Sequence, residues 1–154
     1  MQRPQRAALL LGAAVVLTSL TGCTQAGPGG GPFVPIDADL LTDSRTATNA
    51  PAEIQPQAGQ KACGEVLLQQ GRSLSADARE CFEVNIGATA ARLVVALPTD
   101  EGDPIVYYYL TAAGLKGYDL IIDQTRDRYS SGGWTRQRYQ PADTIDESAA
   151  CSTS

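Results

Sequence analysis

Two short segments rich in carboxylates are the part of this sequence best equipped for chemistry. Segment 99–104 reads TDEGDP, and segment 123–128 reads DQTRDR. Clustered carboxylates suit a bound cation or a pair of groups for acid–base catalysis. A turn explains the first segment more simply, because Asp and Thr bond to nearby backbone and Gly accepts a positive φ. In the second, Arg128 and Trp134 occupy the positions where a calcium loop requires Gly and Glu, so we predict no metal site.

Aromatic and arginine side chains form a second candidate site. Tyrosines occur at 107–109, 118, 129 and 139, interleaved with Trp134 and two arginines. One face of a sheet built from these residues would stack on a sugar or peptide, with arginine holding a carboxylate or phosphate. The alternative is structural, because Tyr and Trp form strands well and half of them would cover a helix. The candidate ligand-binding residues are Tyr108, Trp134, Arg136 and Arg138.

Several classes of chemistry are missing from the composition. The chain has no histidine, which excludes Ser-His-Asp and Cys-His catalysis and zinc held by histidine. Neither Lys61 nor Lys116 has a serine three residues before it, so a Ser-Lys pair of that spacing is absent. The formal net charge of −5 disfavours nucleic acid as a partner, because binding it draws on basic residues that release counterions. We therefore assign no catalytic residue, no metal ligand and no cofactor.

The N-terminal segment carries a targeting pattern. Arg3 and Arg6 precede an uncharged stretch, 7–20, whose 14 residues are too few to cross a bilayer as a helix. The following residues 20–23 read LTGC and resemble the lipobox of bacterial lipoproteins. The resemblance implies that a signal peptide, 1–22, is removed and that Cys23 is lipidated. Two acyl chains give stable anchoring, so we expect a secreted protein held by lipid at the outer face of the cytoplasmic membrane.

Composition divides the rest of the chain. We expect a lipidated cysteine and flexible tether over 23–60, a small domain over 61–141 and a flexible C-terminal tail over 142–154, because the two flanking stretches are poor in large apolar residues. Once Cys23 is set aside, Cys63, Cys81 and Cys151 remain. We favour a Cys63–Cys81 disulfide, whose loop would stabilise the domain by about 3 kcal/mol. Cys151 is then a free thiol or the true partner of one of the others.

Periodicity predicts one helix followed by strands. Ser75 caps a helix that places Ala78, Cys81 and Phe82 on one face and ends near Gly87. Segment 65–68 is a short strand or a turn of helix, and the further strands are 93–97, 105–110, 118–123 and 134–139. Short links favour antiparallel neighbours. The predicted fold is α+β: one main helix packed on a four-stranded or five-stranded antiparallel meander, with a hairpin turn at 131–132 that would place Asp127 opposite Arg136.

A further pattern resembles a known group of proteins. Residues 99–105 match T-x-E-G-D-P-I, residues 123–127 match D-x-T-R-D, and Trp134 follows. This combination resembles small secreted lipoproteins of unknown function from high-GC Gram-positive bacteria, over roughly 63–139. The group offers no activity to carry over. Its pattern includes a cysteine a few residues after the tryptophan, whereas Cys151 comes later here.

Together these features favour a lipid-anchored cell-envelope protein with a small non-catalytic binding or accessory domain. Its expected partners are the membrane, through the lipid on Cys23, and an envelope protein or glycan. One alternative is a carboxylate-dependent hydrolase of an envelope glycan, which would use two carboxyls about 5–10 Å apart. Another is an inhibitor or partner subunit, which would expose a contiguous apolar patch. The hydrolase would draw on Asp100, Glu101, Asp103, Asp123 and Asp127.

Overall fold

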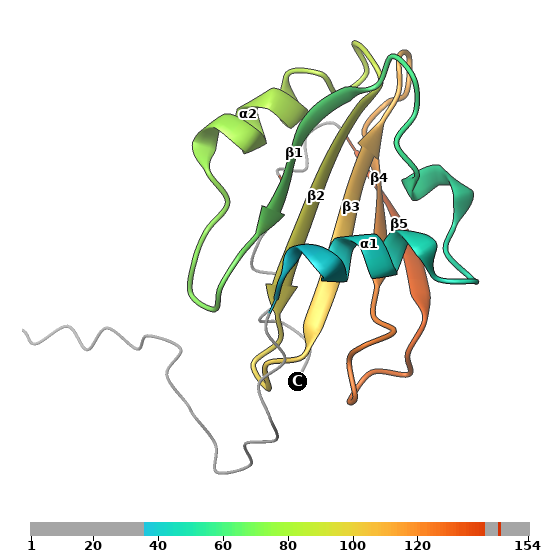
Figure 1. Ribbon diagram of the computed structural model, residues 1–154. Helices are drawn as coiled ribbons and strands as arrows, with labels where there is room; N and C mark the ends of the chain where they lie inside the picture. The colour runs from blue at the N-terminus through green and yellow to red at the C-terminus, as the bar shows by residue number, and fades with distance from the viewer. Residues whose placement is uncertain (1–35, 141–144, 146–154) are drawn as a thin grey trace, which may run out of the picture.

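The computed structural model describes residues 36–140 and residue 145 (Figure 1). The signal peptide 1–22, Cys23 and its lipidation, the tail 142–154 apart from Ile145, and Cys151 lie outside these residues, so those expectations stay predictions. Within the part of the chain that is described, no helix has the length and apolar character needed to cross a bilayer.

The domain is an α+β fold built on one five-stranded mixed sheet, as the α+β prediction required. The strands lie side by side in chain order. Helices α1 and α2 and a short 3-10 helix, η1, accompany the sheet. The bounds are α1 Ala38–Thr46, η1 Ala52–Ile54, β1 Lys61–Leu67, α2 Ala76–Glu83, β2 Ala91–Pro98, β3 Pro104–Thr111, β4 Tyr118–Asp123 and β5 Trp134–Tyr139.

The expectation of a purely antiparallel meander is wrong at one edge of the sheet. Strands β2 to β5 pair antiparallel, but β1 pairs parallel with β2. The chain between β1 and β2 passes through α2, and this crossover returns the chain to the same end of the sheet before β2 begins. Short links therefore predicted the direction of the later strands correctly and gave no information about β1.

Helix α2 packs on one face of the sheet, beside β1 and β2. The Ser75 hydroxyl caps it by accepting from the Ala78 amide, as predicted. The predicted Cys63–Cys81 disulfide joins the helix to β1, with 5.5 Å between the Cα atoms. Phe82 is fully buried and makes T-shaped contacts with the Tyr109 and Tyr118 rings, so this face has an aromatic core.

Helix α1 covers the opposite face, and its position corrects the expectation of a flexible tether for residues 36–60, while 23–35 lie outside the described residues. Figure 1 shows it lying across the strands. Asp37 caps it by accepting from the Leu40 amide. Leu40, Leu41 and Ile54 are buried against the sheet. Apolar residues are few between 36 and 60, but those few lie together on one face, and burying them stabilises the helix.

The predicted pairing across the last hairpin is also wrong. Strand β4 ends at Asp123, which lies opposite Trp134, and Arg136 lies opposite Ile121 rather than Asp127. The Asp123 carboxylate accepts from the amide and hydroxyl of Thr125. This local bonding turns the chain out of the sheet, so 124–133 form a long loop instead of extending the strands.

Candidate functional site

The face of the sheet that carries α2 also contains a groove beyond the helix. Its volume is about 510 Å³. Its floor comes from alternate residues of β2 to β5, which share this face because side chains alternate along a strand. Its mouth comes from the loops 99–103 and 124–133. The floor residues are Leu97, Ile105, Tyr107, Leu120, Ile122, Thr135, Gln137 and Tyr139.

The two loops at the mouth are joined by an ion pair. Asp103 is 2 % exposed, and its carboxylate accepts from the backbone amide and the Nε of Arg128 at 3.1 and 2.9 Å. The hydrogen bond from the Arg128 side chain is the main reason that the pKa of Asp103 lies below its ordinary value. Thr99 holds the base of its own loop, accepting from the Asp103 amide. The Asp103–Arg128 pair therefore holds the two loops of the groove mouth together.

Tyr107 is the buried polar group on the groove floor. Its side chain is 7 % exposed and lines the groove, and no hydrogen bond joins its hydroxyl to another residue in the described region. Burial, together with the negative charge of Asp127 and the nearby Tyr139, raises the pKa of Tyr107 to about 12. The hydroxyl stays protonated at neutral pH and can donate a hydrogen bond to a ligand.

Polar side chains complete the groove. Gln124 and Ser130 line the side formed by the loop after β4. Gln137 on β5 accepts a hydrogen bond from the Tyr139 hydroxyl at 2.7 Å. Tyr129 at the mouth is 71 % exposed. The groove therefore combines Leu, Ile and Tyr side chains with several converging polar groups that can orient a small ligand.

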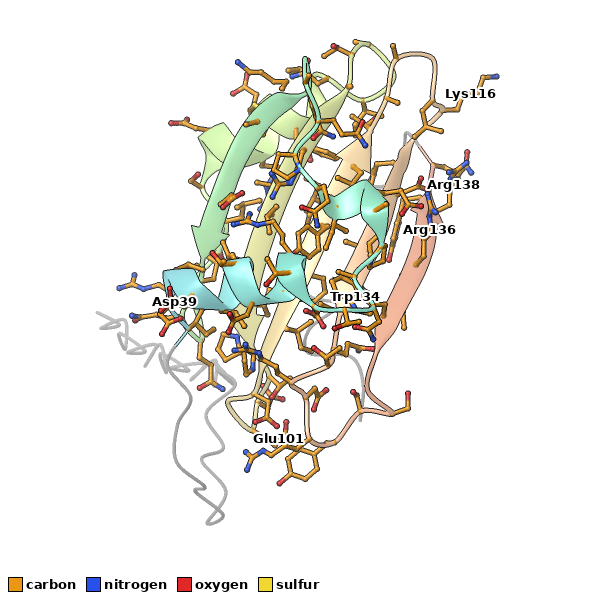
Figure 2. All side chains as sticks on the ribbon, turned by 45° about the vertical axis from the view of Figure 1, so that its right-hand side comes forward. Asp39, Glu101, Lys116, Trp134, Arg136 and Arg138 are labelled. Carbon is orange, nitrogen blue, oxygen red and sulfur yellow. A yellow bond between two sulfur atoms is a disulfide. The ribbon has the colours of Figure 1, made fainter. Side chains whose placement is uncertain are left out.

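The four residues predicted to bind a ligand do not line this groove, so their role stays a prediction. Tyr108 is fully buried under α1 and donates to Ser44. Trp134 lies near Tyr108, with 6.1 Å between the ring centroids. Figure 2 places Arg136 and Arg138 together on β5, where both donate to the carboxylate of Asp119. All four lie on the sheet face opposite the groove, because side chains alternate along a strand and these occupy the even-numbered positions of β3 and β5.

The five candidate carboxylates also separate into two sets. Asp103 is held by Arg128, and Asp123 lies on the α1 face, where it accepts from Ser44. Asp100, Glu101 and Asp127 line the groove. Among residues 36–140 and 145, no group of three or more Asp, Glu or Cys side chains is arranged to hold a metal ion.

Sequence reasoning missed Tyr107, Gln137 and Tyr139 as groove residues, although a signal was present. The strands 105–110 and 134–139 were located correctly, and their odd-numbered residues share one face. Counting in steps of two would have grouped the three residues. No protein-family model, no curated protein and no solved structure matches this chain, so the site rests on its own geometry.

Proposed function

We propose that this chain is a lipid-anchored protein of the outer face of the cytoplasmic membrane whose domain binds a small component of the cell envelope. The lipobox-like residues 20–23 support the anchor. The groove supports binding and is the observation that carries the proposal. Its volume of about 510 Å³ lies within the range of small-ligand sites. Tyrosine rings would stack on the ligand, while amide and hydroxyl groups would orient it.

Binding accounts for the described carboxylates better than catalysis does. Asp103, Asp119 and Asp123 are committed to hydrogen bonds that hold the fold together. A hydrolase of envelope glycan is a second proposal, favoured by the placement of Asp100, Glu101 and Asp127 around one groove. The two proposals differ in outcome, because a hydrolase releases reducing ends from cell-wall glycan and loses that activity in Glu101→Gln. A binding protein releases none.

A partner-subunit role has weaker support. The large apolar side chains exposed in the described part of the chain are Leu67, Val84 and Tyr129. They belong to β1, to the turn after α2 and to the loop after β4. The groove is the more specific feature, because aromatic and polar groups converge on it from several elements.

The test has two readouts on the full chain. The wild type is expected in the detergent phase of a phase-partition assay and Cys23→Ala in the aqueous phase, because the acyl chains supply the affinity. In NMR titrations of Cys23→Ala with soluble fragments of cell wall from a high-GC Gram-positive bacterium, amide shifts are expected around Tyr107 and Gln137. Gln137→Ala weakens binding, whereas Gln57→Ala, an exposed control outside the groove, does not. Equal partitioning contradicts the anchor, and unchanged groove amides contradict the binding role.

A further inference from the structure

The groove carries charge of one sign. Asp100 and Glu101 line it from the loop between β2 and β3, and Asp127 lines it from the loop between β4 and β5. No lysine or arginine of the described residues lines it. Figure 2 shows Glu101 at the lower end of the sheet and Lys116 at the opposite, upper end. A ligand in this groove meets a negative potential.

The cations nearest in sequence are held by other carboxylates. Arg128 bonds to Asp103, and Arg126 pairs with Asp43 of α1. Neither pair includes a groove carboxylate, and no salt bridge or side-chain hydrogen bond to another side chain is made by Asp100, Glu101 or Asp127 within the described region. Within residues 36–140 and 145, the three groove carboxylates therefore have no cationic partner.

Aromatic rings in the groove also favour a cationic ligand. The ring of Tyr129 is mostly exposed at the mouth, where the Arg128 guanidinium lies over one face at 5.9 Å from the centroid, and Tyr107 and Tyr139 line the floor. Tyrosine faces attract ammonium groups. The Tyr107 side chain is more than nine-tenths buried, yet its hydroxyl has no partner in the described structure while it lines the groove. The hydroxyl is therefore available to bond to a ligand atom in the groove.

We propose that the groove binds a small organic cation, a primary ammonium carried on a short aliphatic chain. The ammonium lies among Asp100, Glu101 and Asp127 at the mouth, and the aliphatic chain packs on the floor near Ile105 and Ile122. This assignment rests on the proposed binding role of the groove and specifies the ligand class. The same chemistry occurs in a free diamine and in a lysine-like side chain of a wall peptide.

Matched probes test the charge directly. In NMR titrations of full-length Cys23→Ala, two ammonium probes, cadaverine and Nα-acetyl-lysine amide, are compared with pentane-1,5-diol and with glutarate. The diol has the chain length of cadaverine without its charge, and glutarate carries the opposite charge. The ammonium probes are expected to shift groove amides saturably and to bind at least roughly tenfold more tightly than the diol. The tighter of the two identifies a free or a peptide source. Added salt is expected to weaken binding of both.

Charge-neutral variants complete the test. Glu101→Gln and Asp127→Asn are each expected to weaken cadaverine binding by about threefold. Asp39→Asn, an exposed control on α1, leaves affinity unchanged. Glu101 is exposed, so its variant is expected to fold normally even if Asp127→Asn does not.

The inference is overturned if the diol or glutarate binds as tightly as the ammonium probes, or if neither ammonium probe binds. If wall fragments still shift the groove amides in either case, the binding role stands and only the ligand class is wrong. If the wall fragments also leave the groove unchanged, both the binding role and the ligand class fail.

Discussion

Ser44 of α1 joins the helix to the sheet through hydrogen bonds with two other buried polar side chains. The Ser44 hydroxyl donates to Asp123 at 2.6 Å and accepts from the Tyr108 hydroxyl at 2.8 Å. All three side chains are nearly or fully buried. Burial is the main reason that the pKa of Tyr108 is raised, so its hydroxyl remains a donor. The network stabilises the fold only while each member has its partners, since an unpaired buried polar group is costly.

Ser44→Ala is expected to lower the free energy of unfolding by about 1–3 kcal/mol, because it leaves both Asp123 and Tyr108 short of a partner. Denaturant unfolding measures this loss. Thr42→Ala is the control, since Thr42 is exposed on the same helix and the change should alter stability by less than about 0.5 kcal/mol. Equal effects of the two substitutions would show that the network does not stabilise the domain.

Among the elements, α1 changes the description of the molecule most. Sequence composition assigned it to a tether, yet it buries Leu40 and Leu41 against β2, β3 and β4. Because α1 covers one face of the sheet and the α2 side covers the other, every residue of β3 is buried. Helix α1 also separates Tyr108 from the groove, which lies on the other face. An apparently peripheral helix therefore decides which side of the sheet is open to a ligand.

Leu40→Ala is expected to destabilise the domain by about 2–5 kcal/mol, because it leaves a cavity under α1. Leu40 is 2 % exposed. Asp39→Ala alters the adjacent exposed position and is expected to cost much less. Thermal unfolding of both variants measures the difference. If Leu40→Ala unfolds at the wild-type temperature, α1 does not pack on the sheet in solution.

At the scale of the whole molecule, ion pairs between separate segments contribute to the response to acid. Asp103 and Asp119 both have a pKa below the ordinary value of 3.8, chiefly because Arg128 and Arg138, respectively, donate side-chain hydrogen bonds to them. A carboxyl whose pKa is lower in the folded state stabilises that state above its unfolded pKa. This stabilisation is lost as the pH falls below about 4 and passes through the lowered folded pKa.

The free energy of unfolding is therefore expected to fall as the pH is lowered from about 5 to 2. Asp119→Asn is expected to reduce this slope, because the amide cannot titrate, and to lower stability at neutral pH. Asp39→Asn, whose side chain is exposed on α1, serves as the control and is expected to keep the wild-type slope. Denaturant unfolding at several pH values measures both. An unchanged slope in Asp119→Asn would show that its ion pair does not govern acid sensitivity.

Local features were the ones predictable from the residues alone. The Ser75 cap, α2, and the strands around 105–110, 118–123 and 134–139 were located nearly as the structure has them, because capping and strand propensity act between near neighbours. The Cys63–Cys81 pair was predicted because Cys63 opens the first structured segment and Cys81 lies inside the predicted helix, and the structure contains it. The acidic segment 99–104 was predicted as a turn and lies largely in the loop between β2 and β3, whereas 124–128 was expected to extend the last hairpin.

The remaining features depend on contacts between residues far apart in the chain. Packing of α1, the parallel direction of β1 and the Asp103–Arg128 pair join segments that local periodicity cannot relate. The groove belongs to the same class, since its floor comes from four strands and its mouth from two loops. The chain's residue types supplied the tyrosines and carboxylates of the candidate site. The tertiary structure decided which of these tyrosines and carboxylates share the groove. Side chains alternate between the two faces of a strand, and α1 covers one face while the groove lies on the other.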